Sequence, residues 1–336
     1  MEPIPPNPNF KFIVESELAT GVWCEPKPEL ITGCVKKWAQ DVKVEAVRVP
    51  GYWYNSPRSQ IPAGTRAQPK EKVFYHLHGG AYVVGSASPF LGATIPVATG
   101  LLEKTKTVNR LFSLEYRISS SAPFPIGNPF PAALIDTITG YNYLIIELGF
   151  EPKNVIVVGD SSGGHMALCL FRYLLETSVL SLPGGFIGNS PVCDITSSHL
   201  ATRDSSLEFE TDILGRMDKG SLGWAWMTFT GPLYDDPIDG PTKNPYLSPA
   251  CLSSDIESTI SFKRFPDTFL VFGGAERMRD EIRTLKKRLV RDLGEGKVTV
   301  YEPPDAIHAF LLFKWHEPER AEGFELISRW VDQRQS

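Results

Sequence analysis

The sequence predicts an α/β fold with a mostly parallel central sheet and helices on both of its faces. Short apolar segments of strand character alternate with longer segments of helical character, and the residues best suited to chemistry follow the strand segments. Such alternation is typical of a parallel sheet, and open sheets of this class bind ligands beyond the carboxyl ends of their strands. The expected strands are 44–54, 72–77, 110–116, 154–159, 186–189, 268–272 and 298–301, and the expected helices are 96–104, 131–148, 164–177, 280–293 and 320–331.

The expected strand 72–77 runs into the small-residue segment His78-Gly79-Gly80-Ala81-Tyr82. Small residues let backbone N–H groups approach a substrate oxygen closely, as in an oxyanion loop that follows an early strand. We expect Gly79, Gly80 and Ala81 to form this loop, with the N–H groups of Gly80 and Ala81 as donors. Each such donor is worth on the order of a hundredfold in rate. His78 is expected to brace the loop through its ring and not to act in catalysis.

A second motif follows the expected strand 154–159. The run Gly159-Asp160-Ser161-Ser162-Gly163 fits the pattern Gly-x-Ser-x-Gly, and helical composition follows it. A strand, this turn and a helix form a nucleophile elbow, whose strained turn exposes the serine hydroxyl above the sheet. Ser161 is therefore the expected nucleophile, and the N–H of Ser162 at the helix start is a third oxyanion donor. The alternative is an ordinary connection between a strand and a helix.

The other two members of a catalytic triad are expected after the last two strands, in the chain order serine, acid, histidine. His308 lies on a loop after the strand 298–301 and is the best placed of the six histidines; the alternative is a solvent-exposed loop histidine. Two carboxylates compete for the acid, Glu276 on the loop after 268–272 and Asp280 about one turn into the next helix. We favour Glu276, because a loop carboxylate can reach the imidazole. Asp280 would then be a helix-start carboxylate facing the helix dipole.

With these elements in order, the chain resembles the hormone-sensitive-lipase-like carboxylesterases, which have the α/β-hydrolase fold. The resemblance spans about residues 44–330 and implies a helical cap over the serine. Two departures concern the site: Ala81 stands where the family usually has a third glycine, and Glu276 where it usually has aspartate. The motifs that carry the resemblance are His78-Gly79-Gly80-Ala81, Tyr116-Arg117, Phe130-Pro131-Ala132-Ala133, Gly159-Asp160-Ser161-Ser162-Gly163-Gly164, Ser190-Pro191-Val192-Cys193-Asp194 and Ile307-His308-Ala309-Phe310.

Two segments interrupt the alternation, one up to residue 40 and one over residues 195–263. The resemblance implies that 41–194 and 264–336 form the catalytic core, and that 1–40 and 195–263 form the cap region. Large apolar side chains of the second segment, with Tyr82 beside the oxyanion loop, are expected either to line an acyl or alcohol pocket or to form the cap's own core. These candidate substrate-binding residues are Tyr82, Trp224, Trp226, Met227 and Phe229.

The composition is that of a soluble enzyme. A chain of 336 residues can bury a large core in one domain, and its formal charge of −5 argues against a nucleic-acid-binding surface. No apolar stretch approaches the roughly 20 residues needed to span a bilayer, and residues 1–9 lack the pattern of a signal peptide. Five cysteines without metal-binding or redox spacing favour free thiols and a cytoplasmic location.

These features predict a serine hydrolase that cleaves a hydrophobic carboxylic ester of small to medium size through an acyl-enzyme on Ser161. Its partner is a small-molecule ester, and the chemistry needs no metal or organic cofactor. The same triad could serve an acyltransferase, a lactonase or an arylformamidase-type amidase. A non-catalytic ligand-binding protein on this fold is the alternative from another class. The sequence leaves open the physiological substrate and the oligomeric state, a homodimer included.

Overall fold

In the computed structural model, which describes residues 13, 16–90, 94–215 and 220–334, the chain is built around one central sheet. Across the sheet, the strands lie in the order β1 (Thr20–Cys24), β2 (Val49–Asn55), β4 (Val108–Leu114), β3 (Lys72–Leu77), β5 (Val155–Asp160), β6 (Gly185–Asn189), β7 (Asp267–Val271) and β8 (Val298–Tyr301). The second strand across the sheet, β2, pairs antiparallel with both of its neighbours, β1 and β4, and all other neighbouring strands pair in parallel. The predicted α/β fold with a mostly parallel sheet is thus confirmed.

The side chains of the central strands enter two hydrophobic clusters, one on each face of the sheet. In β5, Val155 and Val157 belong to one cluster, whereas Ile156 and Val158 belong to the other. Successive side chains of a strand point to opposite faces, so a strand that is apolar at every position must be covered on both. The continuous apolar run before Ser161 therefore fixes β5 in the middle of the molecule.

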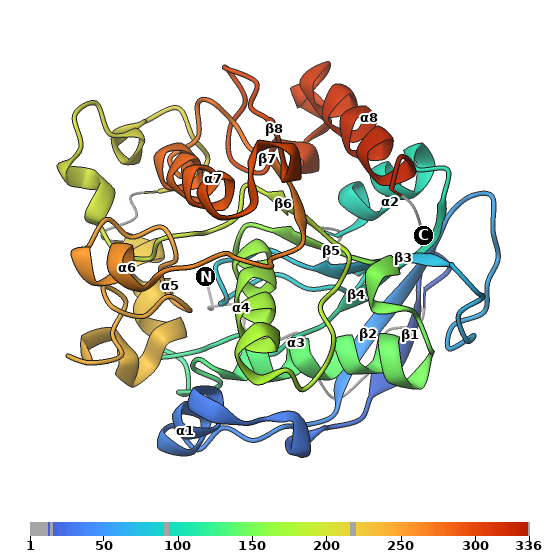
Figure 1. Ribbon diagram of the computed structural model, residues 1–336, viewed down its shortest axis with the longest axis horizontal. Helices are drawn as coiled ribbons and strands as arrows, with labels where there is room; N and C mark the ends of the chain where they lie inside the picture. Colours follow the sequence, from blue (N-terminus) through green and yellow to red (C-terminus); the bar gives the residue numbers. More distant parts are fainter. Residues whose placement is uncertain (1–12, 14–15, 91–93, 216–219, 335–336) are drawn as a thin grey trace.

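Helices cover both faces of the sheet, as the alternation predicts (Figure 1). One face carries α3 (Ala132–Asn142), α4 (Ser162–Thr177) and α7 (Arg279–Leu293), and the other carries α2 (Ile95–Lys104) and α8 (Glu319–Asp332). The predicted helix 131–148 is α3 followed by a π-helical turn, Tyr143–Glu147. Within the described ranges, no helix combines the length and the apolar character needed to cross a membrane.

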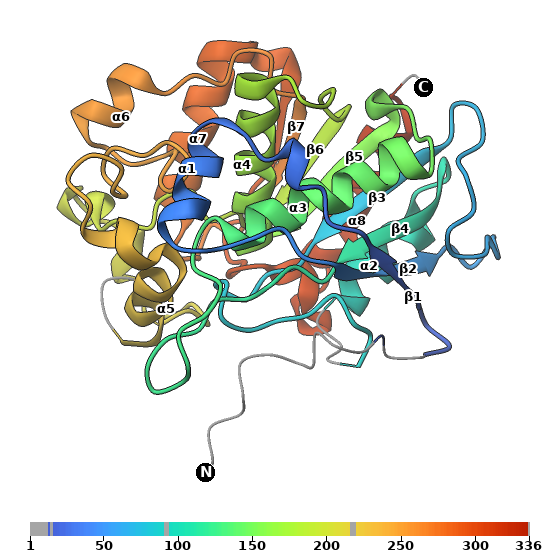
Figure 2. The same ribbon diagram turned by 90° about the horizontal axis from the view of Figure 1, so that it is seen from below.

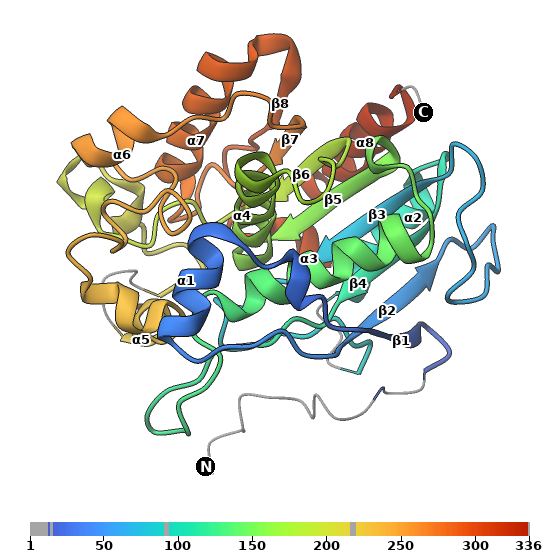
Figure 3. The same cartoon turned by 60° about the horizontal axis from the view of Figure 1, so that its bottom comes forward.

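The segment 195–263 contributes α5 (Gly220–Thr230) and α6 (Ser254–Thr259), which lie at one end of the molecule beside α1 (Gly33–Asp41) (Figures 2 and 3). Contacts of Trp38 join α1 to this segment. The indole Nε1–H donates a hydrogen bond of 3.0 Å to Asp239 Oδ2, and the ring packs edge-on against Tyr246. The N-terminal helix and the segment 195–263 thus form one continuous layer, which we call the cap.

The N-terminal segment departs from the expected division at residue 40. The strand β1 pairs antiparallel with β2, so this part of the chain extends the core sheet and only α1 joins the cap. The strand escapes notice in the sequence because it is a five-residue edge strand with largely half-exposed side chains, which gives it little apolar pattern. Residues 1–9 lie outside the described residues.

Candidate active site

Ser161 occupies the turn between β5 and α4 with the dihedral angles φ 51° and ψ −115°. Positive φ is uncommon and strained for a residue with a side chain, and it persists only where neighbours hold it. Here the Ser161 N–H donates to the carbonyl oxygen of Asn189 (2.9 Å), and the Ser161 carbonyl accepts from the N–H of Val192 (3.0 Å). A Cβ at Gly163 would lie 2.0 Å from the carbonyl oxygen of Leu77, so glycine lets α4 pack directly on β3. The turn has the geometry of a nucleophile elbow.

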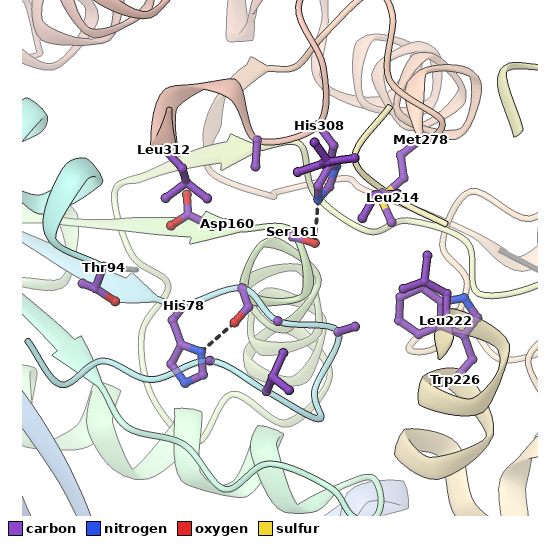
Figure 4. Close-up of a pocket in the computed structure, with 17 residues that line it drawn as sticks. His78, Thr94, Asp160, Ser161, Leu214, Leu222, Trp226, Met278, His308 and Leu312 are labelled. Carbon is purple, nitrogen blue, oxygen red and sulfur yellow. Dashed lines mark hydrogen bonds between the residues drawn. The ribbon is translucent and has the colours of Figure 1, made fainter. Parts of the chain in front are cut away.

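His308 lies within hydrogen-bond distance of the candidate nucleophile (Figure 4). Its Nε2 is 3.0 Å from Ser161 Oγ. The side chain lies on the loop after β8, as expected, but it is buried, which rules out the alternative of a solvent-exposed histidine. Two hydrogen bonds fix the backbone of this loop: the His308 N–H donates to Asp212 Oδ1 (3.0 Å), and the Ala309 N–H donates to Ser190 Oγ (2.9 Å).

Glu276 presents its carboxylate to the other ring nitrogen of His308. Its Oε1 is 3.5 Å from His308 Nδ1, and neither atom has another hydrogen-bond partner among the described residues. This separation is longer than a normal N–H···O bond, and catalytic contacts of this kind tighten as the reaction proceeds. The second oxygen, Oε2, accepts bonds from Ser190 Oγ (2.6 Å) and from the Gly273 N–H (2.7 Å). The carboxylate is fully buried and held by one oxygen so that the other faces the imidazole.

Asp280, the competing carboxylate, faces away from the imidazole toward the cap. Its Oδ2 accepts a hydrogen bond of 2.8 Å from the Ser206 N–H, and its Oδ1 accepts one of 2.9 Å from Arg279 Nε. Burial acts against the charge of Asp280, but these bonds outweigh it and lower the pKa of its carboxyl. Asp280 therefore anchors the cap segment at the start of α7.

The electrostatic surroundings of His308 favour its protonated form. Burial lowers the pKa of the ring, but interaction with the Glu276 carboxylate and with the charges of Asp212 and Asp160 outweighs it, so the pKa lies above its ordinary value of 6.5. An imidazole in these surroundings is suited to act as a general base, because its conjugate acid is stabilised when it takes a proton.

The oxyanion loop is braced from below by His78 and Tyr116. The two rings stack at a centroid distance of 4.1 Å, and the Tyr116 hydroxyl donates a bond of 2.6 Å to the His78 carbonyl. His78 Nδ1–H donates to the Gly79 carbonyl (2.8 Å), and burial lowers the pKa of the ring to about 4, so it stays neutral. The next residues have positive φ, 125° at Gly80 and 51° at Ala81, which produces the tight turn. His78 thus has the bracing contacts expected from the sequence.

A cavity of about 560 Å³ opens over Ser161 and His308. Gly79, Gly80 and Ala81 lie in its wall, together with Asp160. The rest of the wall is mainly apolar and comes from the oxyanion loop, the cap and the loops after β7 and β8 (Figure 4). Its large apolar residues are Val84, Ile213, Leu214, Leu222, Trp226, Met278 and Leu312.

Of the five candidate substrate-binding residues, the structure places one, Trp226, in this wall. Leu222 and Trp226 are four residues apart on α5 and share the face that meets the cavity. Trp224 lies on another face and donates through Nε1 to the Ala122 carbonyl (2.9 Å), and the side chain of Met227 is exposed. Tyr82 and Phe229 stack on each other at a centroid distance of 3.6 Å and are fully buried. The expectation that these four line the pocket is corrected: Met227 is exposed, Trp224 packs against the segment 122–124, and Tyr82 and Phe229 form an apolar contact between the cap and the core.

Two polar residues of the site have no role assigned from the sequence. Ser190 joins the acid to the histidine loop, since its hydroxyl donates to Glu276 and accepts from the Ala309 N–H. Its position directly after β6, at the carboxyl edge of the sheet, is a signal that could have revealed it. Asp212 also contacts the histidine loop, and nothing in its sequence neighbourhood indicates this.

Comparison with known proteins gives the family. The sequence profile of a family described by the alpha/beta hydrolase fold matches residues 74–312, well over half of the chain. The chain belongs to the α/β-hydrolase family. An acetyl-hydrolase of Streptomyces hygroscopicus is 25% identical to this α/β hydrolase over 261 residues, which cover 76% of this chain and 73% of the relative. The versiconal hemiacetal acetate esterase of Aspergillus parasiticus is 23% identical over 300 residues, which cover 87% and 83%.

Solved structures share the fold of this α/β hydrolase. An esterase from the bacterial hormone-sensitive lipase family superposes with a TM-score of 0.65 at 20% identity, over 95% of this chain and 86% of that one. A hormone-sensitive lipase from a metagenome library gives a TM-score of 0.62 at 24% identity, over 84% and 80%. The fold implied by the sequence resemblance is therefore confirmed.

Proposed function

We propose that this α/β hydrolase cleaves a hydrophobic carboxylic ester of small to medium size through an acyl-enzyme on Ser161. The observation that carries the proposal is the contact of 3.0 Å between Ser161 Oγ and His308 Nε2, with Glu276 on the far side of the same ring. A hydroxyl, an imidazole and a carboxylate in this order form an activated serine nucleophile.

In the first half-reaction, His308 Nε2 accepts the proton of Ser161 Oγ while that oxygen attacks the ester carbonyl carbon. The carbonyl oxygen becomes an oxyanion and accepts hydrogen bonds from the N–H groups of Gly80, Ala81 and Ser162. His308 then gives its proton to the alkoxy oxygen as the carbon–oxygen bond breaks, so the alcohol leaves and the acyl group stays on Ser161. Glu276 orients the ring and stabilises the imidazolium throughout.

In the second half-reaction, water replaces the alcohol. His308 takes a proton from the water molecule as its oxygen attacks the acyl carbon, and a second oxyanion forms at the same three N–H groups. The imidazolium protonates Ser161 Oγ as the ester bond to the enzyme breaks. The carboxylic acid leaves, and the serine hydroxyl and the neutral ring are restored.

The shape and polarity of the cavity support an uncharged substrate with a short or medium acyl group. A volume of about 560 Å³ matches a small organic ligand, and the lining found in the described residues contains no lysine or arginine to pair with a free carboxylate. Two relatives are named for acetyl or acetate ester hydrolysis, which agrees with a short acyl group. All five cysteines are free thiols, which supports a cytoplasmic location as part of the proposal.

The proposal is tested with the variant Ser161→Ala and a control, Ser258→Ala, which removes an exposed hydroxyl on α6. We expect the unmodified chain and the control to hydrolyse p-nitrophenyl acetate and butyrate and to react covalently with a fluorophosphonate. Ser161→Ala should lose the label and nearly all turnover. Mass spectrometry of the labelled peptide identifies the modified residue, and a label on any residue other than Ser161 would refute the assignment.

A further inference from the structure

The carboxylate of Asp212 accepts hydrogen bonds from three separate stretches of backbone. Oδ1 accepts from the N–H of the adjacent Ile213 (2.8 Å) and from the N–H of His308 (3.0 Å). Oδ2 accepts from the N–H of Arg277 (2.8 Å), the residue that directly follows Glu276. One side chain of the cap thus contacts the loop of the catalytic histidine and the loop of the catalytic acid at the same time.

Arg277 strengthens this connection from the opposite side. Its guanidinium donates from Nε to the Leu214 carbonyl (3.0 Å) and from Nη1 to the Leu207 carbonyl, and the residue is buried. Ile213 and Leu214 lie in the wall of the cavity over Ser161 and His308. The bonds of Asp212 and Arg277 therefore join the cavity wall to both triad loops.

We propose that Asp212 is a positioning residue, which holds the loops of His308 and Glu276 in register with the cap wall of the cavity. This inference rests on the proposed function, since it assigns a task within the same triad. The charge of Asp212 has a second effect, since it stabilises the imidazolium together with Glu276 and Asp160.

The variant Asp212→Asn tests whether Asp212 positions the two loops or is an ordinary surface carboxylate. In Asp212→Asn one oxygen can still accept from Ile213 and His308, but the amide NH2 then faces the N–H of Arg277, and two donors repel. The variant Asp212→Glu keeps the charge and displaces the carboxylate by one methylene. Asp204→Asn is the matched control, because it removes an exposed carboxylate from the same segment.

We expect Asp212→Asn to lower kcat by about ten- to a hundredfold, the scale of a small misplacement of catalytic groups. The acid limb of its pH–activity profile should move to lower pH, because loss of the negative charge lowers the pKa of His308. Asp212→Glu should lose kcat with its acid limb nearly in place, and Asp204→Asn should match the unmodified chain in both readouts. Titration of the His308 ring by NMR gives the same pKa change without any need for turnover.

Two outcomes would overturn the inference. One is an unchanged kcat in Asp212→Asn, whether or not its acid limb moves. The other is a fall in kcat with no movement of the acid limb and a lowered melting temperature, which marks a purely structural residue. Failure of the proposed function would look different, since the unmodified chain itself would show neither turnover nor a label on Ser161. The NMR titration of His308 would still respond to Asp212→Asn in that case.

Discussion

At the scale of single residues, the two oxygens of Glu276 have separate tasks. Oε2 is held by Ser190 Oγ and the Gly273 N–H, and Oε1 is left to face His308 Nδ1. The glutamate side chain is one methylene longer than the aspartate that is usual in the hormone-sensitive-lipase-like carboxylesterases, which the sequence resembles. The loop accommodates that length by tying one oxygen back to Gly273 at its own start.

Glu276→Gln is expected to lower kcat/KM by roughly ten-thousandfold. Ser190 Oγ–H and the Gly273 N–H both donate to the position of Oε2, so an oxygen must stand there. The glutamine oxygen will therefore occupy it, and the NH2 group will point at His308 Nδ1. That arrangement places the ring proton on Nε2, the nitrogen that must accept the proton of Ser161. Asp280→Asn should stay within about tenfold of the unmodified chain, because its contacts are with Ser206 and Arg279.

The measurement is a parallel kinetic comparison of the two purified variants on one p-nitrophenyl ester, with melting curves for both. Asp280→Asn should show the lower melting temperature of the two, because it loses the charged acceptor of the Ser206 N–H in the cap segment. A loss of activity in Asp280→Asn as large as that in Glu276→Gln would show that the acid is misassigned.

At the scale of secondary-structure elements, the elbow depends on how closely α4 approaches β3. Gly163→Ala would bring a Cβ to 2.0 Å from the Leu77 carbonyl oxygen and 2.6 Å from that of His78, both of them backbone atoms that cannot rotate away. We expect this variant to lose about 3 kcal/mol or more of the free energy of unfolding, at the upper end for overpacking. Gly296→Ala is the control, because nothing lies within 4 Å of its added Cβ. Equal stability of the two variants in urea unfolding would contradict the close packing of α4 on β3.

The order of strands and helices also explains which parts of the site can be predicted from the sequence and which cannot. Ser161, Glu276 and His308 each follow an apolar strand in a parallel sheet, so the alternation that predicts the strands also predicts that these residues meet at one edge. The part played by Asp212 cannot be read in this way, because its partners Arg277 and His308 lie 65 and 96 positions further along the chain. The stacking of Tyr82 on Phe229 is equally non-local, and it decides that both rings are packed away from the cavity.

At the scale of the whole molecule, activity and the contribution of Glu115 to stability are expected to respond to pH in opposite directions. His308 must be neutral to accept a proton, and its pKa is raised, so activity should fall as the pH drops through a value above 6.5. Glu115 lies just after β4 and supports the segment that follows the oxyanion loop. Its Oε2 accepts from Ser86 Oγ and from the N–H groups of Ala87 and Ser88, yet burial raises its pKa from 4.5 to about 7.

Glu115→Gln isolates this contribution to stability. A group whose folded pKa is raised stabilises the fold fully below its unfolded pKa, and that stabilisation is lost as the pH rises through the folded pKa. For Glu115 the loss amounts to on the order of 3 kcal/mol between about pH 4.5 and pH 7. The glutamine oxygen can accept the same three bonds without titrating, so the free energy of unfolding of Glu115→Gln should depend less steeply on pH than that of the unmodified chain. Glu103→Gln, which alters an exposed carboxylate on α2, should keep the original slope.

The acid limb of the pH–activity profile gives a second, independent measurement. It should stay in place in Glu115→Gln, because Glu115 is not among the groups that raise the pKa of His308. Urea unfolding and kcat/KM are measured on all three proteins over the same pH series. If the free energy of unfolding of Glu115→Gln depends on pH as steeply as that of the unmodified chain, Glu115 is already ionised near pH 5. A displaced acid limb in the pH–activity profile would show that Glu115 acts on His308 as well. With the expected result, the contribution of Glu115 to stability is greatest at a pH where His308 is protonated and cannot accept the proton of Ser161.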